Sequence, residues 1–466
     1  MEQKSRSSFS GRVGFVLAAA GSAVGLGNLW RFPYLAAQYG GGIFLLVYLI
    51  LVVTFGFALM VTEIAIGRKT RLSCIGAYKA LDKRFGFLGW IATLVPVIIT
   101  PYYCVIGGWV MKYLFTFVTG QGMTAADNGG FFDSFIGFDA GSLPATMLDF
   151  SGPTPWFLLF VLATTVVVIF GVEKGIERAS RFMMPILAVL AIFVAIYSLT
   201  IPGAMAGLKY YLLPDFSQFS LSTVLGALGQ MFYSMSLAMG IMITYGSYMK
   251  KENLLEHSVT QIEVFDTLFA FVAGLMIIPA VVAFNGGDPS QINSGPGLMF
   301  VTLPMVFESM HFGEIIGAVF FLLVLFAALT SSISLMETIV SVVMDKTHMK
   351  RKPATLVVMV IILLVGIPSC LGYGPWAAIE IIGMQFLDFF DFISNSVLMP
   401  IVAVLTCILV GHVIGTKVIA DEVKEGAGAF HREKMYHVMI RWIAPVLLVT
   451  ILVSELLTKV FHLFSI

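Results

Sequence analysis

Three glycines and two polar side chains interrupt the first hydrophobic segment of the chain, which reads VGFVLAAAGSAVGLGNLWRFPYLAAQ. Gly21, Gly25 and Gly27 are followed by Asn28 and Arg31 in a stretch that is otherwise apolar. In a helix interior glycine costs up to about 1 kcal/mol relative to alanine, and arginine costs about 2.5 to 3.5 kcal/mol at a bilayer centre. A broken membrane helix exposes N–H and C=O groups, which are tolerated only where they line a cavity and can bind something. We therefore predict that this segment forms half of a transporter's binding site.

A second segment, residues 223–250, has the same character in the other half of the chain. It reads TVLGALGQMFYSMSLAMGIMITYGSYMK, and its small, amide or hydroxyl residues in mid-span are Gly226, Gly229, Gln230, Ser234, Ser236 and Gly240. Small residues in a single membrane helix commonly serve close helix packing. Two such segments five spans apart instead match an inverted five-helix repeat, which holds its substrate near the midplane between two broken helices.

Two further sets of oxygen-bearing side chains lie in apolar segments. Asp266 stands in the seventh span, where a buried carboxylate is expensive unless it is paired. The eighth span contains Thr330, Ser331, Ser332 and Ser334. Taken alone, these four hydroxyls favour helix packing over cation binding.

The composition requires a membrane environment for these segments. The 466 residues are 58% hydrophobic and 12% charged, with a mean hydropathy of +0.94, which excludes a soluble globular domain. Runs long enough to cross about 30 Å of hydrocarbon predict about eleven helices. They lie at residues 13–38, 41–66, 88–119, 153–171, 180–201, 223–249, 257–285, 313–344, 354–373, 376–411 and 440–462.

The positive charges predict the orientation of the chain. If the N-terminus is cytoplasmic, only four of the 27 Lys and Arg residues lie outside the inner segments, namely Arg31, Lys112, Lys209 and Lys459. The opposite loops carry Asp127, Asp133, Asp139, Asp149, Asp215 and Asp288. The positive-inside rule then places the N-terminus in the cytoplasm and, for an odd number of spans, the C-terminus outside. Residues 1–12 are polar and show no removable signal.

Several classes of function are disfavoured. The four cysteines form no CxxC pair and the seven histidines no HxxxH spacing, so a metal or redox enzyme is not expected. No GxxxxGK[ST] stretch occurs, so energy must come from an ion gradient. The net charge is zero and no basic patch suggests a nucleic-acid partner. A channel would need a continuous pore from repeated subunits or charged rings, which the sequence lacks.

Four stretches carry a resemblance to a known family. GSAVGLGNLWRFPYLAAQYGGGIFLLVY, PYYCVIGGW, GQMFYSMSLAMGIMITYGSY and AALTSSISLME resemble the neurotransmitter:sodium symporter family, in its bacterial branch of amino-acid transporters. The resemblance runs from Arg6 to about Asp391 and implies a single all-α integral membrane domain with the five-plus-five inverted-repeat, leucine-transporter-like fold. Its first and sixth helices would be unwound at mid-membrane. The parts of this domain, residues 1–466, would be a cytoplasmic segment 1–12, repeats 13–201 and 223–411, and an eleventh helix 440–462.

The resemblance also implies two sodium ions. A sodium ion prefers a cage of oxygens, which unwound backbone and Asn, Ser and Thr side chains supply. The ligands expected for sodium site 1 are the substrate carboxylate, the Ala23 carbonyl, Asn28, Ser234 and Asp266. Those expected for sodium site 2 are the carbonyls of Gly21, Val24 and Ala327 with the hydroxyls of Thr330 and Ser331. Once the LTSS motif is matched to the family pattern, the last two hydroxyls become ligands rather than packing groups.

The same resemblance implies an amino-acid zwitterion between the broken helices. Its carboxylate would meet the Leu26 and Gly27 amides and the Tyr103 hydroxyl, because free N–H groups at a half-helix end attract anions. Its ammonium would face the carbonyls of Ala23, Tyr233 and Ser236. The other expected pocket residues are Val24, Ile99, Ser234, Met239, Ser331 and Leu335. This wall has no charged partner for a second charge, so a neutral hydrophobic or aromatic amino acid is expected. Met239 replaces an aromatic residue of the leucine-specific relative and is an adaptable gap filler, which favours broad specificity.

Two ion pairs are expected to gate the path. Arg31 and Asp391 resemble an outer gate above Tyr103 and Tyr233. Arg6 and Asp345 resemble an inner gate, assisted by Tyr248 and by Phe9, where relatives usually carry tryptophan. Exposed pairs contribute only about 0.2 to 1 kcal/mol, which suits a latch that opens in every cycle. The alternative for Arg6 is a solvated residue of the positive-inside set.

Chloride independence is a further expectation. Chloride-dependent relatives hold an anion at residues matching Tyr48, Gln230 and Ser234, and the position matching Asp266 is usually neutral there. Here Asp266 would supply the negative charge itself, and its protonation when sodium leaves would ease the return step. The function expected is sodium-coupled amino-acid symport by alternating access in the plasma membrane of a bacterium. A transport-deficient amino-acid sensor is the alternative, although a sensor need not retain the cation ligands and gates.

Two connections between spans are long enough for a prediction of their own. Residues 286–312 contain glycine and proline breaks between short apolar pieces, which indicate a loop that folds back over the entrance or an exposed linker. Residues 413–439 are rich in charge, and we expect a solvated cytoplasmic connector there.

Overall fold

The computed structural model describes residues 7–138, 149–289, 292, 295–425 and 428–460. Within these residues every regular element is a helix, and the β-type pairings are two isolated bridges, Gly41 to Pro214 and Ile381 to Met384. The fold is therefore all-α, as predicted. Arg6, the predicted inner-gate arginine, lies outside the described residues.

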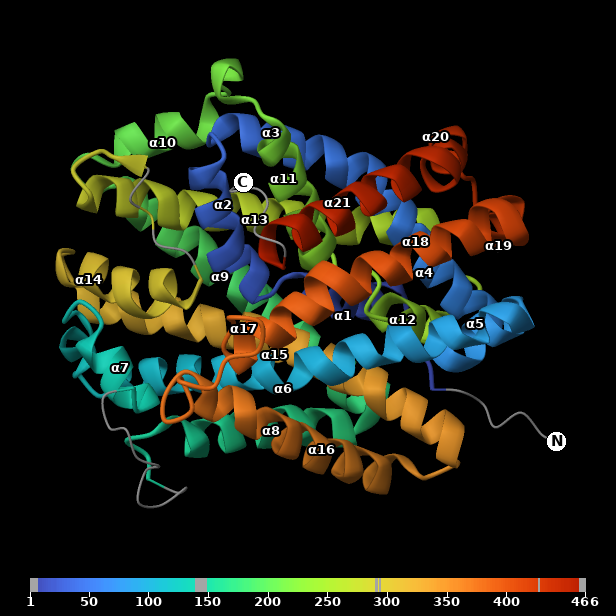
Figure 1. The fold of residues 1–466 in the computed structure, drawn as a ribbon, viewed down its shortest axis with the longest axis horizontal. Coiled ribbons are helices and arrows are strands. Elements are labelled where there is room, and N and C mark those ends of the chain that lie inside the picture. The colour runs from blue at the N-terminus through green and yellow to red at the C-terminus, as the bar shows by residue number, and fades with distance from the viewer. Residues whose placement is uncertain (1–6, 139–148, 290–291, 293–294, 426–427, 461–466) are drawn as a thin grey trace.

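Long apolar helices make up most of the molecule (Figure 1). In the described part of the chain, eight are long and apolar enough to cross a membrane. They are built from α3 (Gly42–Leu51) with α4 (Phe57–Thr70), α6 (Gly86–Val118), α9 (Arg178–Leu199), α13 (Leu255–Phe284), α15 (Gly313–Thr347), α16 (Arg351–Gly372), α17 (Phe386–Asp391) with α18 (Met399–Ile408), and α20 (Glu433–Val438) with α21 (Ala444–Lys459).

The other three predicted spans are bent, interrupted or short. The first consists of α1 (Arg12–Ala23) and a second piece, Gly27–Gln38, which contains α2 (Phe32–Gln38) and is bent by 51° relative to α1. The sixth consists of α11 (Leu221–Ser234) and α12 (Ile241–Tyr248). The fourth is α8 (Pro153–Ile169), which has 17 residues. Both glycine-rich segments are thus interrupted close to the residues that the sequence singles out.

The start of the tenth span was predicted wrongly. The apolar run suggests a helix from residue 376, but the helix begins at Phe386. The preceding residues form turns, with positive φ at Ile382 (55°) and Gly383 (71°) and a bridge from Ile381 to Met384. Hydrophobicity alone does not reveal this boundary, because the turn residues are as apolar as the helix that follows them.

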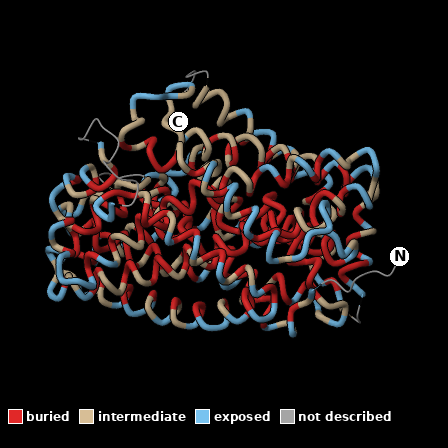
Figure 2. Tube along the Cα trace, turned by 90° about the horizontal axis from the view of Figure 1, so that it is seen from below, coloured by how far each residue is buried: buried red, intermediate tan, exposed pale blue. Residues whose placement is uncertain are grey.

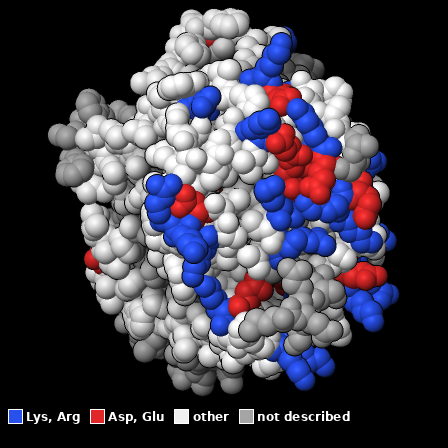
Figure 3. All heavy atoms as spheres, turned by 90° about the vertical axis from the view of Figure 1, so that its right-hand side faces the viewer, with Lys and Arg blue, Asp and Glu red and all other residues white. Residues whose placement is uncertain are grey.

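The connections between spans gather at the two ends of the bundle. In Figure 1, α7 (Gly130–Ile136), α10 (Ala204–Leu212) and α14 (Leu303–Glu308) lie toward the left end, whereas α5 (Cys74–Leu81) and α19 (Lys417–Lys424) lie toward the right end. Figure 3 shows that Lys, Arg, Asp and Glu side chains gather on the right-hand face. Buried residues fill the space between the ends, and exposed residues lie along the outside of the peripheral helices (Figure 2).

The segment 286–312 packs back onto the bundle through α14 and the turn that precedes it. Phe300 is fully buried, and its ring lies 5.7 Å from that of Trp109 and 5.5 Å from that of Phe132. The Tyr113 hydroxyl donates to the Phe300 carbonyl at 2.8 Å. The described part of this segment is therefore attached to α6 and α7 rather than extended into solvent.

The connector 413–439 was predicted to be solvated, and this prediction was wrong for part of the segment. Glu422 of α19 is 2% exposed and forms salt bridges with Arg68 Nε and Lys251 Nζ, each at 2.8 Å. Arg432 of the same connector pairs with Glu263 Oε2 of α13 at 3.0 Å. Glu422 and Arg432 look solvated in the sequence because their partners lie on α4, α13 and the turn after α12, far away along the chain.

Candidate functional site

At the two helix breaks, backbone N–H and C=O groups are released from the hydrogen bonds that they would form within a regular helix. Helix α1 ends at Ala23 and helical turns resume at Gly27, while α11 ends at Ser234 and α12 begins at Ile241. Within the second break, Ser236 and Ala238 adopt positive φ angles of 53° and 58°. Such angles in residues other than glycine cost on the order of 1 to 3 kcal/mol and persist where the surroundings impose them, commonly at functional sites.

Two glycines of the first break allow a close approach of side chains from other helices. A Cβ atom on Gly25 would lie 2.6 Å from Ser331 Oγ and 3.0 Å from the Tyr103 hydroxyl. A Cβ on Gly27 would lie 2.7 Å from the ring of Tyr233. The glycine spacing that marks this segment in the sequence is therefore needed for packing against α6, α11 and α15.

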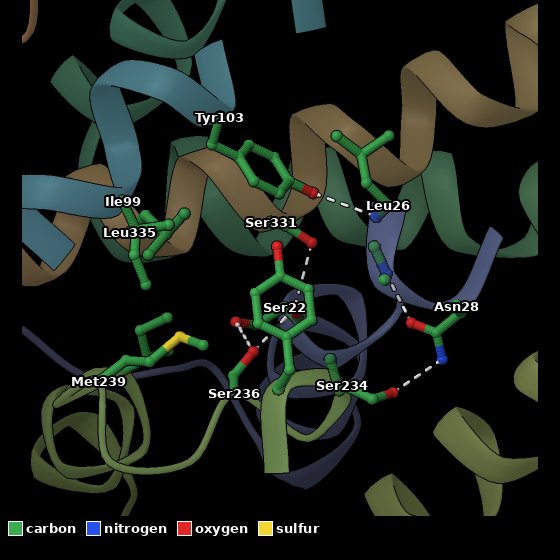
Figure 4. Close-up of a pocket in the computed structure, with 15 residues that line it drawn as sticks. Ser22, Leu26, Asn28, Ile99, Tyr103, Ser234, Ser236, Met239, Ser331 and Leu335 are labelled. Carbon is green, nitrogen blue, oxygen red and sulfur yellow. Dashed lines mark hydrogen bonds between the residues drawn. The ribbon is translucent and has the colours of Figure 1, made fainter. Parts of the chain in front are cut away.

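A pocket lies between the two breaks and is closed by α6 and α15 (Figure 4). Its lining residues are Ser22, Ala23, Gly25, Leu26, Gly27, Asn28, Ile99, Tyr103, Tyr233, Ser234, Ser236, Met239, Ile241, Ser331 and Leu335. All the residues predicted to bind substrate are among them except Val24, which is fully buried beside the pocket. The sequence analysis did not single out Ser22, Gly25 or Ile241 as pocket residues.

One end of the pocket presents hydrogen-bond donors. The Leu26 N–H donates to the Tyr103 hydroxyl oxygen at 3.3 Å, an interaction visible in Figure 4. The tyrosine oxygen accepts there, so its own O–H hydrogen can be directed at an anionic group. Gln230 Nε2 donates to the Gly27 carbonyl at 2.9 Å and fixes the adjoining turn. This end of the pocket therefore suits a carboxylate.

A buried carboxylate lies next to this end. Asp266 is fully buried, and its Oδ1 accepts hydrogen bonds from Asn28 Nδ2 at 2.8 Å and Ser234 Oγ at 2.8 Å. The Tyr48 hydroxyl donates to Oδ2 at 3.4 Å. Asn28 thus directs its amide nitrogen, not the oxygen expected of a sodium ligand, toward Asp266, while its Oδ1 accepts the Gly25 N–H at 3.1 Å. Three of the residues predicted for sodium site 1, Asn28, Ser234 and Asp266, therefore meet, and Asn28 presents its amide nitrogen rather than its oxygen to the other two.

A second group of oxygens lies where α15 passes the end of α1. Ser331 Oγ is 3.4 Å from the Gly21 carbonyl oxygen and 3.4 Å from that of Val24. Thr330 Oγ1 donates to the Ala327 carbonyl at 3.0 Å. The Ser331 hydroxyl therefore meets the Gly21 and Val24 carbonyls, whereas Thr330 Oγ1 bonds within α15. All five residues predicted for sodium site 2 are buried.

The predicted outer-gate residues do not form an ion pair in this conformation. In the described part of the chain no nitrogen of Arg31 lies within 4.0 Å of an Asp391 oxygen. The Arg31 guanidinium instead lies over the Tyr233 ring, 5.5 Å from its centroid. Asp391 Oδ1 accepts from Asn395 Nδ2 at 2.5 Å and from the Tyr102 hydroxyl at 3.1 Å. Asn395 and Tyr102 thus hold the carboxylate that was expected to meet Arg31.

Two of the predicted inner-gate residues, Tyr248 and Phe9, belong to a network that includes two residues the sequence analysis missed, Glu337 and Arg351. The Tyr248 hydroxyl donates to Glu337 Oε1 at 2.7 Å, and Glu337 pairs with both terminal nitrogens of Arg351, at 2.6 and 2.9 Å. Phe9 is fully buried, packs edge-on against Tyr248 and donates its N–H to the Tyr248 carbonyl at 3.2 Å. Asp345 accepts from the Ser73 N–H at 2.9 Å. Glu337 is the single acidic residue between Glu314 and Asp345 in the apolar run of α15, a signal that could have located it from the sequence.

Comparisons with known proteins agree with this geometry. Residues 6–125 and 139–463 match the model of the sodium:neurotransmitter symporter family. The chain is 36% identical to the uncharacterized sodium-dependent transporter YhdH of Bacillus subtilis (strain 168), covering 97% of this chain and 98% of that protein. It is 33% identical to an uncharacterized sodium-dependent transporter of Haemophilus influenzae, covering 97% and 99%. Among solved structures it resembles MhsT in complex with L-phenylalanine, with a TM-score of 0.85 and 39% identity over 97% of this chain and 100% of that one.

Proposed function

The chain belongs to the sodium:neurotransmitter symporter family, and from this premise we propose that it carries neutral hydrophobic or aromatic amino acids together with Na⁺. As a family member it is a sodium-dependent, multi-pass membrane symporter and not an enzyme. Its fold matches that of MhsT over nearly the whole chain. The substrate class, the number of sodium sites and the independence of chloride are the parts that we add.

The lining of the pocket is the observation that carries the substrate class. Ile99, Met239, Ile241 and Leu335 supply apolar walls, and no Lys, Arg, Asp, Glu or His is among the lining residues. A substrate side chain with its own charge would lose water without gaining a partner, which is costly. The similar protein MhsT has been crystallized with L-phenylalanine, which is consistent with a neutral aromatic substrate.

The two groups of oxygens support our proposal of two sodium sites. We assign sodium site 1 to the Ala23 carbonyl, Asn28, Ser234 and Asp266, next to the donor end of the pocket. Because Asn28 now presents its nitrogen to Asp266, the amide must turn over for its oxygen to reach a sodium ion. We assign sodium site 2 to the oxygens of Gly21, Val24, Ala327, Thr330 and Ser331.

Chloride independence rests on the fixed charge of Asp266. Tyr48, Gln230 and Ser234, which match the anion-binding residues of chloride-dependent relatives, surround this carboxylate or the turn next to it. A second negative charge at that place would be repelled at short range. We therefore propose that Asp266 takes the role of chloride.

The orientation and the gates complete the proposal. We place the end with α5 and α19 in the cytoplasm of a bacterium and the end with α7 and α14 outside, with the C-terminus also outside. Arg31 and Asp391 close the outer path in another conformation of the cycle, while Asp345 and Tyr248 hold the inner path, with Phe9 in place of the usual tryptophan. Arg6 retains its proposed role as the partner of Asp345.

Uptake into proteoliposomes tests the proposal directly. Purified protein is reconstituted, and uptake of radiolabelled phenylalanine is measured with an inward sodium gradient and with an equal potassium gradient. We expect accumulation with sodium alone, inhibited by leucine, methionine, tyrosine or tryptophan and not by glutamate or lysine. Competition by glutamate at micromolar concentration would contradict the substrate class. Sodium-dependent binding without uptake would support the amino-acid sensor instead.

A further inference from the structure

A chain of serine hydroxyls links the pocket to the group of oxygens proposed as sodium site 2. Ser334 Oγ donates to Ser22 Oγ at 2.7 Å, and Ser22 Oγ donates to Ser236 Oγ at 3.2 Å. The Ser22 carbonyl oxygen accepts from Ser236 Oγ at 3.0 Å and from Ser331 Oγ at 3.1 Å. All four side chains are buried, and Figure 4 shows Ser22 between Ser236 and Ser331.

Ser22 is the hub of this chain because both its carbonyl and its hydroxyl take part. It stands at the last turn of α1, between Gly21 and Val24, whose carbonyls are assigned to sodium site 2. Through its hydroxyl it contacts Ser236, which lines the pocket and has a positive φ of 53°. A change in the position of Ser22 therefore acts on both sites at once.

Ser331 indicates how sodium would act on this chain. Its Oγ lies 3.1 to 3.4 Å from the carbonyl oxygens of Gly21, Ser22 and Val24, so its hydrogen is directed into a group of three acceptors. A cation bound to the carbonyls of Gly21 and Val24 would require the Ser331 oxygen, not its hydrogen, to face them. The hydroxyl must then rotate, and the Ser22 carbonyl is left to the hydrogen bond from Ser236.

Ser334 supports the hub from α15. It lies one turn after Ser331, does not line the pocket and belongs to neither proposed sodium site. Its Oγ is 2.7 Å from Ser22 Oγ and also 2.7 Å from the Ser331 carbonyl oxygen. Hydrogen bonds in a chain of this kind polarise one another in a buried, low-dielectric setting, so the loss of one weakens its neighbours.

We propose that Ser22 and Ser334 are positioning residues that couple sodium at site 2 to substrate affinity, an inference that rests on the proposed function. Sodium frees the Ser22 carbonyl from Ser331, and the hydrogen bond to Ser236 then fixes the backbone that faces the substrate ammonium. Ser334 holds the Ser22 hydroxyl in place while this exchange occurs. Coupling of this kind is reciprocal, so substrate also raises the affinity for sodium.

Ser332 provides a matched control. It is a fully buried serine on the same helix, but its hydroxyl lies 2.9 Å from that of Thr164 on α8, away from the pocket. A role in helix packing alone would make Ser332→Ala and Ser334→Ala equivalent. Coupling predicts that they differ.

The test measures binding of radiolabelled phenylalanine to purified protein at low and at saturating sodium. The ratio of the two dissociation constants is the coupling factor, which a uniform loss of stability does not change. We expect Ser334→Ala and Ser22→Ala each to lower this factor by about three- to tenfold, the size expected for one hydrogen bond. Ser332→Ala should leave it unchanged, and Ser334→Thr, which keeps a hydroxyl, should retain most of it.

In the double variant Ser22→Ala/Ser334→Ala, the coupling factor should be only slightly lower than in the single variant with the lower factor. Both substitutions break the same chain of hydrogen bonds, so their effects should not add. An unchanged coupling factor in Ser334→Ala and Ser22→Ala would overturn the inference while leaving the proposed function intact. An equal fall in Ser332→Ala would also overturn it. If sodium does not stimulate binding to the unmodified protein, the proposed function itself is wrong. Should Ser334→Ala not fold, the comparison of Ser22→Ala with Ser332→Ala decides.

Discussion

Asn28 and Asp266 are joined across two helices by a hydrogen bond of 2.8 Å in which the amide nitrogen donates to the carboxylate. Ser234 adds a second short hydrogen bond to the same carboxylate, at 2.8 Å. Asp266, in the seventh span, thus keeps its place through donors from the first and sixth spans. A sodium ion about 4 Å away would interact with its charge by about 4 kcal/mol at an effective dielectric constant of 20.

The first prediction is that Asp266→Asn abolishes most sodium-driven uptake in chloride-free medium. The substitution keeps the shape of the side chain but removes the charge, so the sodium concentration for half-maximal uptake should rise by at least about tenfold. Chloride should restore part of the activity of this variant, and it should not affect the unmodified protein. Uptake is compared in gluconate and in chloride media.

Asp421→Asn is the control for this prediction. Asp421 is exposed on α19 and far along the chain from the site, so its loss of charge should leave the sodium dependence unchanged. A strict chloride requirement in the unmodified protein would show that Asp266 does not act in place of chloride.

The second prediction concerns sodium site 2. Thr330→Ala combined with Ser331→Ala removes two oxygens from the proposed cage, and the sodium concentration needed for uptake should rise by about tenfold or more. Ser332→Ala removes a neighbouring hydroxyl that contacts Thr164 instead, and it should have no such effect. Unchanged sodium dependence in the double variant would refute the assignment of this site.

The sequence predicts the interior of the fold better than its ends. Glycine spacing locates both helix breaks, because a close approach such as that of Gly25 to Ser331 leaves no room for a Cβ atom. Apolar runs long enough to span the membrane locate most helices, because a helix forms all its backbone hydrogen bonds internally and can then be surrounded by lipid or protein. The resemblance then brings together residues as distant in sequence as Asn28 and Asp266.

The sequence does not predict which side chains meet at the two ends. Arg31, Asn395 and Tyr102 all lie in the same part of the molecule as Asp391. Only the conformation of the protein decides that Asn395 and Tyr102 form the hydrogen bonds to its carboxylate. Likewise, the pairing of Arg68 with Glu422 joins residues 354 positions apart, and nothing in either local sequence indicates it. Such contacts depend on how whole helices are arranged and not on local pattern.

The third prediction concerns the inner network. Glu337 is fully buried and pairs with Arg351 through two hydrogen bonds, so Glu337→Gln leaves a guanidinium that has lost its counter-charge. Removing one partner of a buried pair typically costs about 3 to 5 kcal/mol, and somewhat less is expected here because Arg351 is 16% exposed. The unfolding temperature in detergent should fall, and uptake should fall with it.

A double-mutant cycle separates the pair from its surroundings. Arg351→Met added to Glu337→Gln should destabilise the protein less than the sum of the two single substitutions, because the unpaired charge is gone. Tyr248→Phe should cost only about 1 kcal/mol, the typical value of one hydrogen bond. Additive effects of the two charge substitutions would show that Glu337 and Arg351 do not act as a pair.

The fourth prediction concerns the connector between the tenth and eleventh spans. Arg68 is fully buried, and its Nε forms a salt bridge with Glu422 at 2.8 Å, while Lys251 forms a second one with the same carboxylate. Glu422→Ala would leave the Arg68 charge buried without this partner, so it should lower the free energy of unfolding by about 3 kcal/mol or more. Glu425 is a neighbouring acid that also pairs with Lys251, but its side chain is 50% exposed, and the hydrogen bond from Lys251 lowers its pKa. Glu425→Ala should therefore cost at most about 1 kcal/mol. Thermal unfolding of both variants in detergent measures the difference, and equal stability of the two would mean that the connector is as loosely held as its sequence suggests.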